Sequence, residues 1–250
     1  MKINRREVFV LSAAVAFAGA AGLPTLAFAK DGDQLDQLKL MAPMAVPDKV
    51  LGDPNAKITV IEYLSPTCPH CALVATTVIG PFKDKYVKTG KVKLVLRPFA
   101  RNTLDAGIFM LAEAAARSAD GQATATGASA EASASSAPAP AATPASYSEG
   151  ASEAWENVID AYFKTQANWE VSDKPLDAIM AVALQLGFTQ DSFNAALKDT
   201  VLFGKIQSMV DQAVKDFGVE GTPTFYINGK QKTGEQSLDQ LSAAVDPLLG

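Results

Sequence analysis

Two cysteines and a histidine fall within four positions of the sequence, at Cys68, His70 and Cys71. They are the only cysteines and the only histidine among the 250 residues. A structural zinc ion takes four ligands, and this cluster supplies three within a single turn. Covalent haem attachment needs a histidine directly after the second cysteine, where Ala72 stands. The spacing therefore favours a dithiol that cycles between thiols and a disulfide, with no metal.

A purely structural disulfide explains this pair poorly, because the two intervening residues close a loop too small to restrain the unfolded chain. Pro69 suits the first turn of a helix, and a helix N-terminus carries unpaired N–H groups and a partial positive charge. That charge, together with a protonated His70, is expected to lower the pKa of the Cys68 thiol. A stabilised thiolate favours the reduced form, so the Cys68–Cys71 disulfide is expected to be oxidising.

The two sulfurs are expected to differ in role. Cys68, at the tip of the helix, is predicted to be exposed and to be the sulfur that a substrate thiolate attacks. Cys71 lies one turn into the helix and is predicted to be the shielded, resolving thiol. A low pKa makes Cys68 a good leaving group when a second substrate thiolate acts.

A strand–helix–strand unit is expected to position the cysteines. Residues 57–64 are β-branched and almost continuously apolar, which predicts a strand covered on both faces. A helix is expected to begin near Cys68 and to be kinked or shortened by Pro81. Residues 91–99 predict a second strand and complete a βαβ unit. The helix is expected to bury one stripe of apolar residues: Val74, Val78, Phe82 and Tyr86.

The remainder is mostly helical until the C-terminal part. Apolar spacing predicts helices around residues 104–117, 155–162, 176–186, 189–197 and 206–217. In the third of these, the expected buried stripe is Leu176, Ile179, Ala183 and Leu186. The segment "TPTFYING" predicts a strand and an Asn-Gly turn, followed by a strand at 231–233 and a closing helix at 238–248. The order βαβ, helical block, ββα indicates an α/β protein.

Residues 121–150 differ in composition from the helices around them. They contain no Leu, Ile, Val, Phe or Met and consist mostly of Ala, Ser, Thr, Pro and Gly. Such a segment buries too little apolar surface to offset its ordering entropy, so a disordered surface loop is expected. A functional tether is the alternative.

The first 29 residues have the layout of a secretory signal peptide. A basic start precedes an apolar stretch, and Ala27 to Ala29 fit a cleavage site. An uncleaved anchor is the alternative, although the apolar stretch is short for a membrane span. The adjacent Arg5 and Arg6 leave both the Sec and the twin-arginine export routes open. Export would place the mature chain, of about 220 residues, where disulfides persist.

The net charge of the chain bears on which partners it can bind. The chain has 22 Lys and Arg against 27 Asp and Glu, a formal net charge of −5. No basic run follows the first 29 residues, which argues against a nucleic-acid partner. The balance is typical of ordinary solubility.

Taken together, these features resemble the DsbA-like thiol:disulfide oxidoreductases of the thioredoxin superfamily. The resemblance rests on "CPHC" after the first strand of a βαβ unit, on "GTPTFYINGK" after a helical insertion, and on the signal-like start. It covers about residues 50–250 and implies a thioredoxin-like fold with an inserted α-helical domain. The implied division is an N-terminal extension at 30–49, fold segments at 50–102 and 218–250, and an insert at 103–217.

The resemblance also assigns roles to residues outside the cysteine motif. It implies that Pro223 follows a cis peptide bond and faces the dithiol, and that the Thr222 backbone binds substrate. An ordinary Gly-Thr-Pro turn is the alternative. Glu62 matches the family's acidic residue beneath the dithiol, where a raised pKa would let it relay a proton to or from Cys71. The alternative is an idle Glu62 in a wet strand end.

The function implied is that of a periplasmic disulfide oxidase. It would donate the Cys68–Cys71 disulfide to exported proteins with reduced cysteines, act as a monomer without a cofactor, and be reoxidised by a DsbB-like membrane partner. A reductase or isomerase on the same fold is one alternative, and the shortness of the N-terminal extension argues against a dimeric isomerase. A redox-inert peptide-binding assembly factor is another, against which the intact "CPHC" argues.

Overall fold

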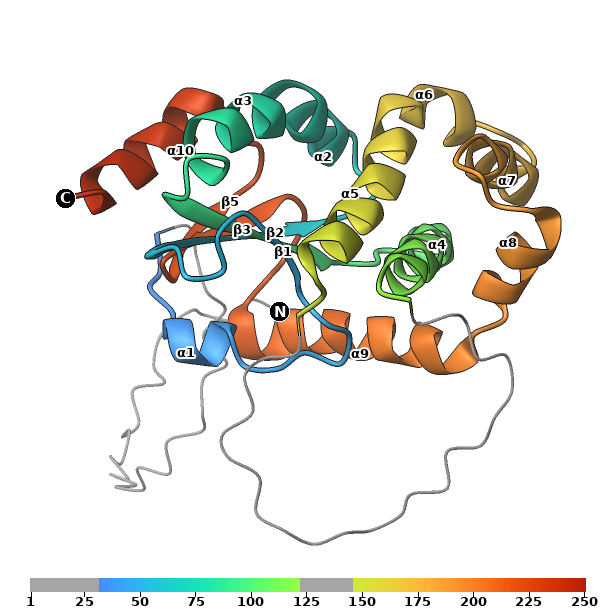
Figure 1. Ribbon diagram of the computed structural model, residues 1–250, viewed down its shortest axis with the longest axis horizontal. Helices are drawn as coiled ribbons and strands as arrows, with labels where there is room; N and C mark the ends of the chain where they lie inside the picture. The colour runs from blue at the N-terminus through green and yellow to red at the C-terminus, as the bar shows by residue number, and fades with distance from the viewer. Residues whose placement is uncertain (1–31, 122–145) are drawn as a thin grey trace, which may run out of the picture.

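A five-stranded sheet forms the centre of the computed structural model, which describes residues 32–121 and 146–250 (Figure 1). The strands are β1 (Lys49–Leu51), β2 (Ile58–Leu64), β3 (Val92–Pro98), β4 (Thr224–Ile227) and β5 (Lys230–Thr233). They lie in the order β1-β3-β2-β4-β5, with β2 and β3 parallel and the other neighbours antiparallel. The predicted signal peptide and most of the predicted loop at 121–150 lie outside the described residues. The end of that loop does not fit the prediction, because Tyr147 is buried and a helix begins at Glu149.

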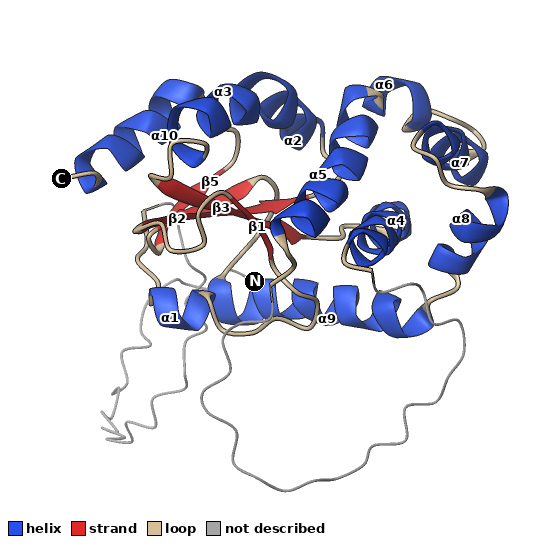
Figure 2. Ribbon diagram, viewed as in Figure 1, coloured by secondary structure: helices blue, strands red, loops and turns tan. Residues whose placement is uncertain are grey.

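Helices cover both faces of this sheet (Figure 2). On one face lie α2 (Pro69–Val74), α3 (Gly80–Phe82) and α10 (Leu238–Val245), which leads into a short 3-10 turn, η3 (Asp246–Leu248). On the other lie α1 (Gln37–Leu40) and part of α9 (Thr200–Phe217). Beside the sheet are α4 (Thr103–Ala119), α5 (Glu149–Lys164), α6 (Gln166–Trp169), α7 (Pro175–Gln185) and α8 (Gln190–Leu197). The expected α/β arrangement, with helices inserted between β3 and β4, is confirmed.

Strand β2 occupies the middle of the sheet, and all seven of its residues are buried, as predicted. Successive side chains point to opposite faces, so the strand contributes to two cores. One core holds both cysteines together with three alternate residues of β2: Ile58, Val60 and Leu64. The other core holds Ile61 and Tyr63 against α9. Glu62 belongs to the first set by alternation, so it faces the side on which the cysteines lie.

The helix after Cys68 continues past Pro81. Helical turns continue from Pro69 to Val87 through α2, the π-helical segment η1 (Ala75–Ile79), α3 and the π-helical segment η2 (Lys83–Val87). Pro81 is predicted to kink or to shorten the helix, and the helix is not shortened there. Pro81 stands in the first turn of α3, and π turns on both sides widen the helix around a residue that lacks an N–H. The four residues of the predicted apolar stripe are all buried.

The sequence pattern does not predict α1, β1 or α6. Strand β1 pairs antiparallel with β3 and is only three residues long. It begins with Lys49, which is fully buried and forms an ion pair with Glu113 of α4. No alternation of apolar and polar residues marks such a strand, so the usual periodicity signal is absent.

The apolar residues expected to be buried in α7 are only partly so. Ile179 and Ala183 are buried, together with Val182. Leu176 and Leu186 are 60% and 37% exposed, which corrects the predicted stripe. Leu176 stands in the first turn and Leu186 is the C-terminal cap, so both extend past the core that the middle of the helix contacts.

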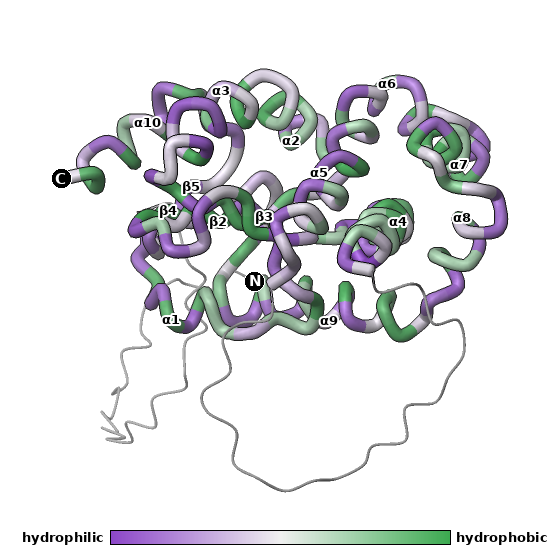
Figure 3. Tube along the Cα trace, viewed as in Figure 1, coloured by the Kyte–Doolittle hydropathy of each residue, from purple (hydrophilic) through white to green (hydrophobic). Residues whose placement is uncertain are grey.

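Helix α9 contributes to both cores. Figure 3 shows hydrophobic and hydrophilic residues alternating along it. Its first ten residues add Leu202, Ile206 and Met209 to the core that holds the cysteines, and the remainder adds Ala213 and Phe217 to the other. Gly218 ends the helix in the left-handed region, at φ 71°, where a residue without Cβ is favoured. The division into segments 50–102, 103–217 and 218–250 stays a prediction.

Across residues 32–121 and 146–250, no helix has the length and hydrophobicity that crossing a bilayer requires.

Candidate active site

The cysteine motif lies at the start of α2, as the sequence predicts. Cys68 is the N-cap residue, with an extended backbone at φ −87° and ψ 117°, and Pro69 follows as the first helical residue. The Cys68 N–H donates to the Ser65 carbonyl at 3.0 Å, and its carbonyl accepts from the Ala72 N–H at 3.1 Å. The chain therefore turns directly from β2 into the helix and carries Cys68 at the junction.

Pro223 faces the dithiol from the other side of the site. The Thr222-Pro223 peptide bond is cis, which confirms that prediction and rules out the ordinary-turn alternative. The Cys68 thiol donates to the Thr222 carbonyl oxygen, at 3.2 Å between sulfur and oxygen. Both cysteines are free thiols here, so the structure represents the reduced form.

The exposure of Cys68 differs from the expectation. Cys68 is only 1% exposed and Cys71 is fully buried. The prediction that Cys68 is open to solvent is therefore wrong, whereas the shielding of Cys71 is confirmed. The reason is the loop before β4, whose Thr222 carbonyl contacts the sulfur that the helix end presents.

The two thiols have opposite electrostatic environments. A hydrogen bond from the Cys71 thiol lowers the pKa of Cys68 to about 5 against the opposing effect of burial, with smaller contributions from Thr222, the Cys71 backbone N–H and the positive charge of Arg101. Burial raises the pKa of Cys71 well above its ordinary value, and the nearby Cys68 and Glu62 raise it further. The predicted direction for Cys68 is confirmed, and the helix end contributes through its N–H group.

His70 is turned toward a different partner. Its Nδ1 lies 2.9 Å from a carboxylate oxygen of Glu235, and the two side chains are 66% and 44% exposed. Glu235 comes from the loop after β5, so this contact joins the cysteine motif to the C-terminal part of the sheet. The expected influence of His70 on the Cys68 thiolate stays a prediction.

Glu62 is buried beneath the dithiol, with only 2% of its surface exposed. Burial raises its pKa to about 8, and the carboxylates of Glu156 and Asp160 on α5 add to the shift. The alternative of a wet strand end is therefore wrong. At neutral pH most of the population holds a proton on this carboxyl, close enough to Cys71 for its charge to affect that thiol.

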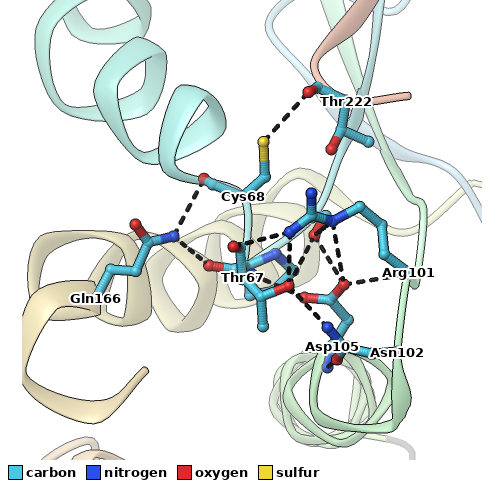
Figure 4. A network of polar contacts seen from close by, with 9 residues as sticks. Thr67, Cys68, Arg101, Asn102, Asp105, Gln166 and Thr222 are labelled. Carbon is cyan, nitrogen blue, oxygen red and sulfur yellow. Dashed lines mark hydrogen bonds and ion pairs between the residues drawn. The ribbon is translucent and has the colours of Figure 1, made fainter. Parts of the chain in front are cut away.

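A polar network that the sequence reasoning missed supports the loop before Cys68 (Figure 4). Its members are Ser65, Thr67, Arg101, Asn102, Asp105 and Gln166. Asn102 caps α4, because its side chain accepts from the Asp105 N–H at 2.8 Å. An Asn three residues before an acidic residue at a helix start was the only available signal, and it indicates a cap rather than a contact with the cysteine loop.

A dithiol at a helix start, in contact with the residue before a cis-proline, defines the class of thioredoxin-fold dithiol proteins. A family model described as thioredoxin matches residues 45–137 and 120–247, and the chain belongs to this family. The thioredoxin-like fold and the resemblance to the DsbA-like group, both expected from the sequence, are confirmed.

Relatives and solved structures agree with this assignment. A Rickettsia bellii protein named as a protein-disulfide oxidoreductase is 28% identical over 202 residues, which cover 81% of this chain and 64% of that protein. A Rickettsia conorii protein of similar name is 25% identical, with 60% of its length covered. The chain thus spans about three fifths of the length of these curated relatives.

Among solved structures, a variant of α-DsbA1 from Wolbachia pipientis has a TM-score of 0.66 at 25% identity, covering 85% of this chain and 95% of that one. BdbD from Bacillus subtilis, in its oxidised form, has a TM-score of 0.62 at 14% identity, covering 88% and 99%. The second likeness concerns the fold alone.

Proposed function

We propose that this chain is a thiol:disulfide oxidoreductase that works as an oxidase, donating the Cys68–Cys71 disulfide to exported proteins with reduced cysteines. One observation carries the proposal: at a single helix start, the pKa of Cys68 is lowered to about 5 while that of Cys71 is raised. A pair that differs in this way has a stable thiolate on the attacked sulfur and a thiol on the other. The reduced form of such a pair is stabilised relative to an ordinary dithiol, which makes the disulfide more oxidising.

The reaction consists of two exchanges. A substrate thiolate attacks the Cys68 sulfur, the Cys68–Cys71 bond breaks, and Cys71 leaves as a thiolate that takes up a proton. The substrate's second thiolate then attacks the substrate sulfur of the mixed disulfide and releases Cys68 as a thiolate. The substrate loses two electrons and the dithiol gains them. A low pKa favours Cys68 as the leaving group in the second exchange.

Residues around the dithiol have separate proposed roles. Glu62, protonated at neutral pH because of its raised pKa, supplies the proton that Cys71 takes up. The Thr222 backbone, beside Pro223, pairs with the extended backbone of the substrate. Pro69 fixes the helix start, and His70 tunes the potential.

The size of the thiolate effect can be bounded. In a two-electron couple, a tenfold change in the equilibrium constant corresponds to about 30 mV. With a Cys68 pKa of about 5, two units below neutral, the thiolate makes the disulfide roughly 60 mV more oxidising than an unionised pair would be. This contribution favours an oxidase over a reductase.

Location and partners follow from the same proposal. Cleavage near Ala29, after export by the Sec or the twin-arginine route, would release the chain into the periplasm. There it would act as a monomer, without a cofactor, and be reoxidised by a DsbB-like membrane protein. A reductase or isomerase on this fold is the second candidate, and Thr222 before Pro223 is the position at which family members that differ in direction vary.

One pair of measurements tests the proposal. The equilibrium of the Cys68–Cys71 pair with glutathione gives its potential, and pH-dependent alkylation of the reduced chain gives the pKa of Cys68. An oxidising potential with an acidic thiol supports the oxidase. A reducing potential with a thiol that titrates near its ordinary value overturns it and favours the reductase. A Cys68→Ser chain that retains its function in cells would instead indicate a redox-inert binding protein.

A further inference from the structure

Thr67, the residue directly before Cys68, has all of its polar groups engaged by the start of α4. Its N–H donates to Asp105 at 2.7 Å. Its carbonyl accepts from the Arg101 guanidinium at 2.8 Å. Its hydroxyl oxygen accepts from the same Arg101 nitrogen and from the Asn102 amide, each at 3.0 Å. The backbone that leads into Cys68 is therefore fixed by a segment more than thirty residues away in the sequence.

Asp105 organises the base of this contact. It is completely buried, and its carboxylate accepts from the Thr67 N–H, from the Ser65 hydroxyl at 2.7 Å and from the Arg101 N–H at 2.9 Å. A buried carboxylate needs such donors, because leaving it unpaired would cost several kcal/mol. Asp105 thus holds both the cysteine loop and the backbone of Arg101 in fixed relation.

Gln166 holds the same loop from the opposite side (Figure 4). Its amide donates to the Pro66 carbonyl at 2.6 Å and to the Cys68 carbonyl at 3.1 Å. With Arg101 on the Thr67 carbonyl, three successive carbonyls of the cysteine loop each accept a hydrogen bond from a side chain that lies outside the loop. The two donors differ in one respect: Arg101 carries a positive charge and Gln166 is neutral.

We propose that Arg101 is a positioning residue for the nucleophile, acting through Thr67 to fix the Cys68 loop and placing a positive charge that favours the Cys68 thiolate. This inference rests on the proposed thiol–disulfide function. The guanidinium also donates to Ser65 at 3.0 Å, so it bridges both ends of the turn before Cys68. Its charge is one of the causes that lower the pKa of Cys68. Gln166 fixes the loop without this charge.

The test compares substitutions that separate geometry from charge. Arg101→Gln removes the charge and the forked donor, Arg101→Lys keeps the charge, and Gln166→Leu removes a donor to the same loop without a charge change. Lys215→Gln on α9 is the matched control, because it removes a positive charge from a side chain that is 70% exposed and pairs only with Asp211 among the described contacts. Thermal unfolding of every variant confirms that it is folded.

Two readouts are measured on each reduced protein: the pH dependence of Cys68 alkylation and the equilibrium with glutathione. Arg101→Gln is expected to raise the Cys68 pKa and to shift the equilibrium about threefold toward the protein disulfide, an effect that weakens with added salt. Arg101→Lys is expected to recover most of this shift. Gln166→Leu is expected to shift the pKa less than Arg101→Gln, and Lys215→Gln not at all.

The outcomes separate this inference from the proposed function. An acidic Cys68 in the unsubstituted chain that stays equally acidic in folded Arg101→Gln overturns the role of Arg101 and leaves the oxidase intact. An Arg101→Lys chain that behaves like Arg101→Gln overturns the charge effect. If Cys68 of the unsubstituted chain titrates like free cysteine, the oxidase proposal fails first, and the role of Arg101 fails with it.

Discussion

The two cysteines of the dithiol have different surroundings, one polar and the other mostly apolar. Above, Cys68 lies in a polar loop whose carbonyls accept hydrogen bonds from Arg101 and Gln166. Below, Cys71 lies against the apolar core and the buried Glu62. The pKa of the first thiol is lowered to about 5, while those of the second thiol and of the carboxyl are raised. Two identical side chains one helical turn apart thus acquire opposite acidities: both are buried, but hydrogen bonds outweigh burial at Cys68, whereas burial dominates at Cys71.

This contrast places the negative charge on the Cys68 side of the disulfide and the proton on the Cys71 side. The polar side stabilises the anion that leaves at the end of the reaction. The apolar side destabilises the anion that forms at its beginning, and it contains a carboxyl that holds a proton at neutral pH. Changing either environment should reduce the difference in acidity between the two thiols. The largest effects are expected when the sulfurs themselves are replaced.

Replacing the sulfurs one at a time should give unequal results. Cys68→Ser is expected to reduce the rate of reaction with a model disulfide by at least about a thousandfold, because the only acidic thiol is gone. Cys71→Ser is expected to react and then to remain as a mixed disulfide, since no resolving thiol follows. Intact mass spectrometry distinguishes the two. Equal reactivity of the two variants would contradict the assigned roles.

The pH dependence should also differ between the thiols. Alkylation of Cys68 is expected to be half-maximal near pH 5, and that of Cys71 only above pH 9. Between pH 5 and 9 Cys68 binds fewer protons in the folded reduced chain than in the unfolded chain, so its contribution to the free energy of unfolding rises with pH. This stabilisation is complete above pH 9 and is lost as the pH falls through 5.

The oxidised chain is the control for this titration, because its sulfurs carry no ionisable proton. The stability of the reduced chain relative to the oxidised chain is therefore expected to increase from pH 5 to pH 8, measured by denaturant unfolding of each form. A difference that does not change with pH would show that the Cys68 thiolate is not selectively stabilised in the folded state.

Removing the buried carboxyl should have a smaller effect on rate and an opposite effect on stability. Glu62→Gln is expected to slow steps in which Cys71 gains or loses a proton by about tenfold. Because the pKa of Glu62 is raised from 4.5 to about 8, its contribution to stability is fully present below pH 4.5 and is lost as the pH rises through 8. Denaturant unfolding of oxidised Glu62→Gln should lack this loss.

Glu153→Gln, an exposed position on α5, is the matched control for Glu62→Gln. It removes a carboxylate from the same region without touching the interior. If both variants alter the pH dependence of stability alike, the effect belongs to the surface charge of α5 and not to the carboxyl beneath the dithiol.

The smallest effect is expected at the rim of the site. Glu235→Gln removes the carboxylate partner of His70, but both side chains are solvent-exposed and such pairs contribute at most about 1 kcal/mol. The glutathione equilibrium is expected to shift by no more than about twofold. A larger shift would show that the His70–Glu235 contact acts on the thiolate as strongly as the loop does.

Local sequence patterns predict the apolar side of the dithiol well. The continuous apolar run of β2 identifies a buried strand, and alternation within it places Glu62 on the side of the cysteines. The proline after Cys68 identifies the helix start. Each of these signals comes from neighbouring residues, so a single stretch of sequence is enough to predict the apolar side of the site.

The polar side depends on contacts between distant segments. Arg101 is 34 residues from Thr67, and Gln166 is 100 residues from Pro66. Neither residue has a spacing that indicates a partner, because the fold alone brings them together. The burial of Cys68 under the Thr222 carbonyl, 154 residues away, is unpredictable for the same reason. Strand β1 is not predicted for the same reason. Its first residue, Lys49, is buried where it pairs with Glu113 of a different element.

Helix α9 limits how this architecture could be simplified. The first half of its 18 residues packs with the helices beside the sheet, and the second half seals the face of the sheet opposite the dithiol. Cutting out residues 103–217 to make a miniature redox protein would remove this helix and leave Ile61, Tyr63 and Val95 without the α9 members of their core. A workable chimaera must therefore retain α9 from Val210 onward, so an engineer would have to place the splice within a helix rather than in a loop.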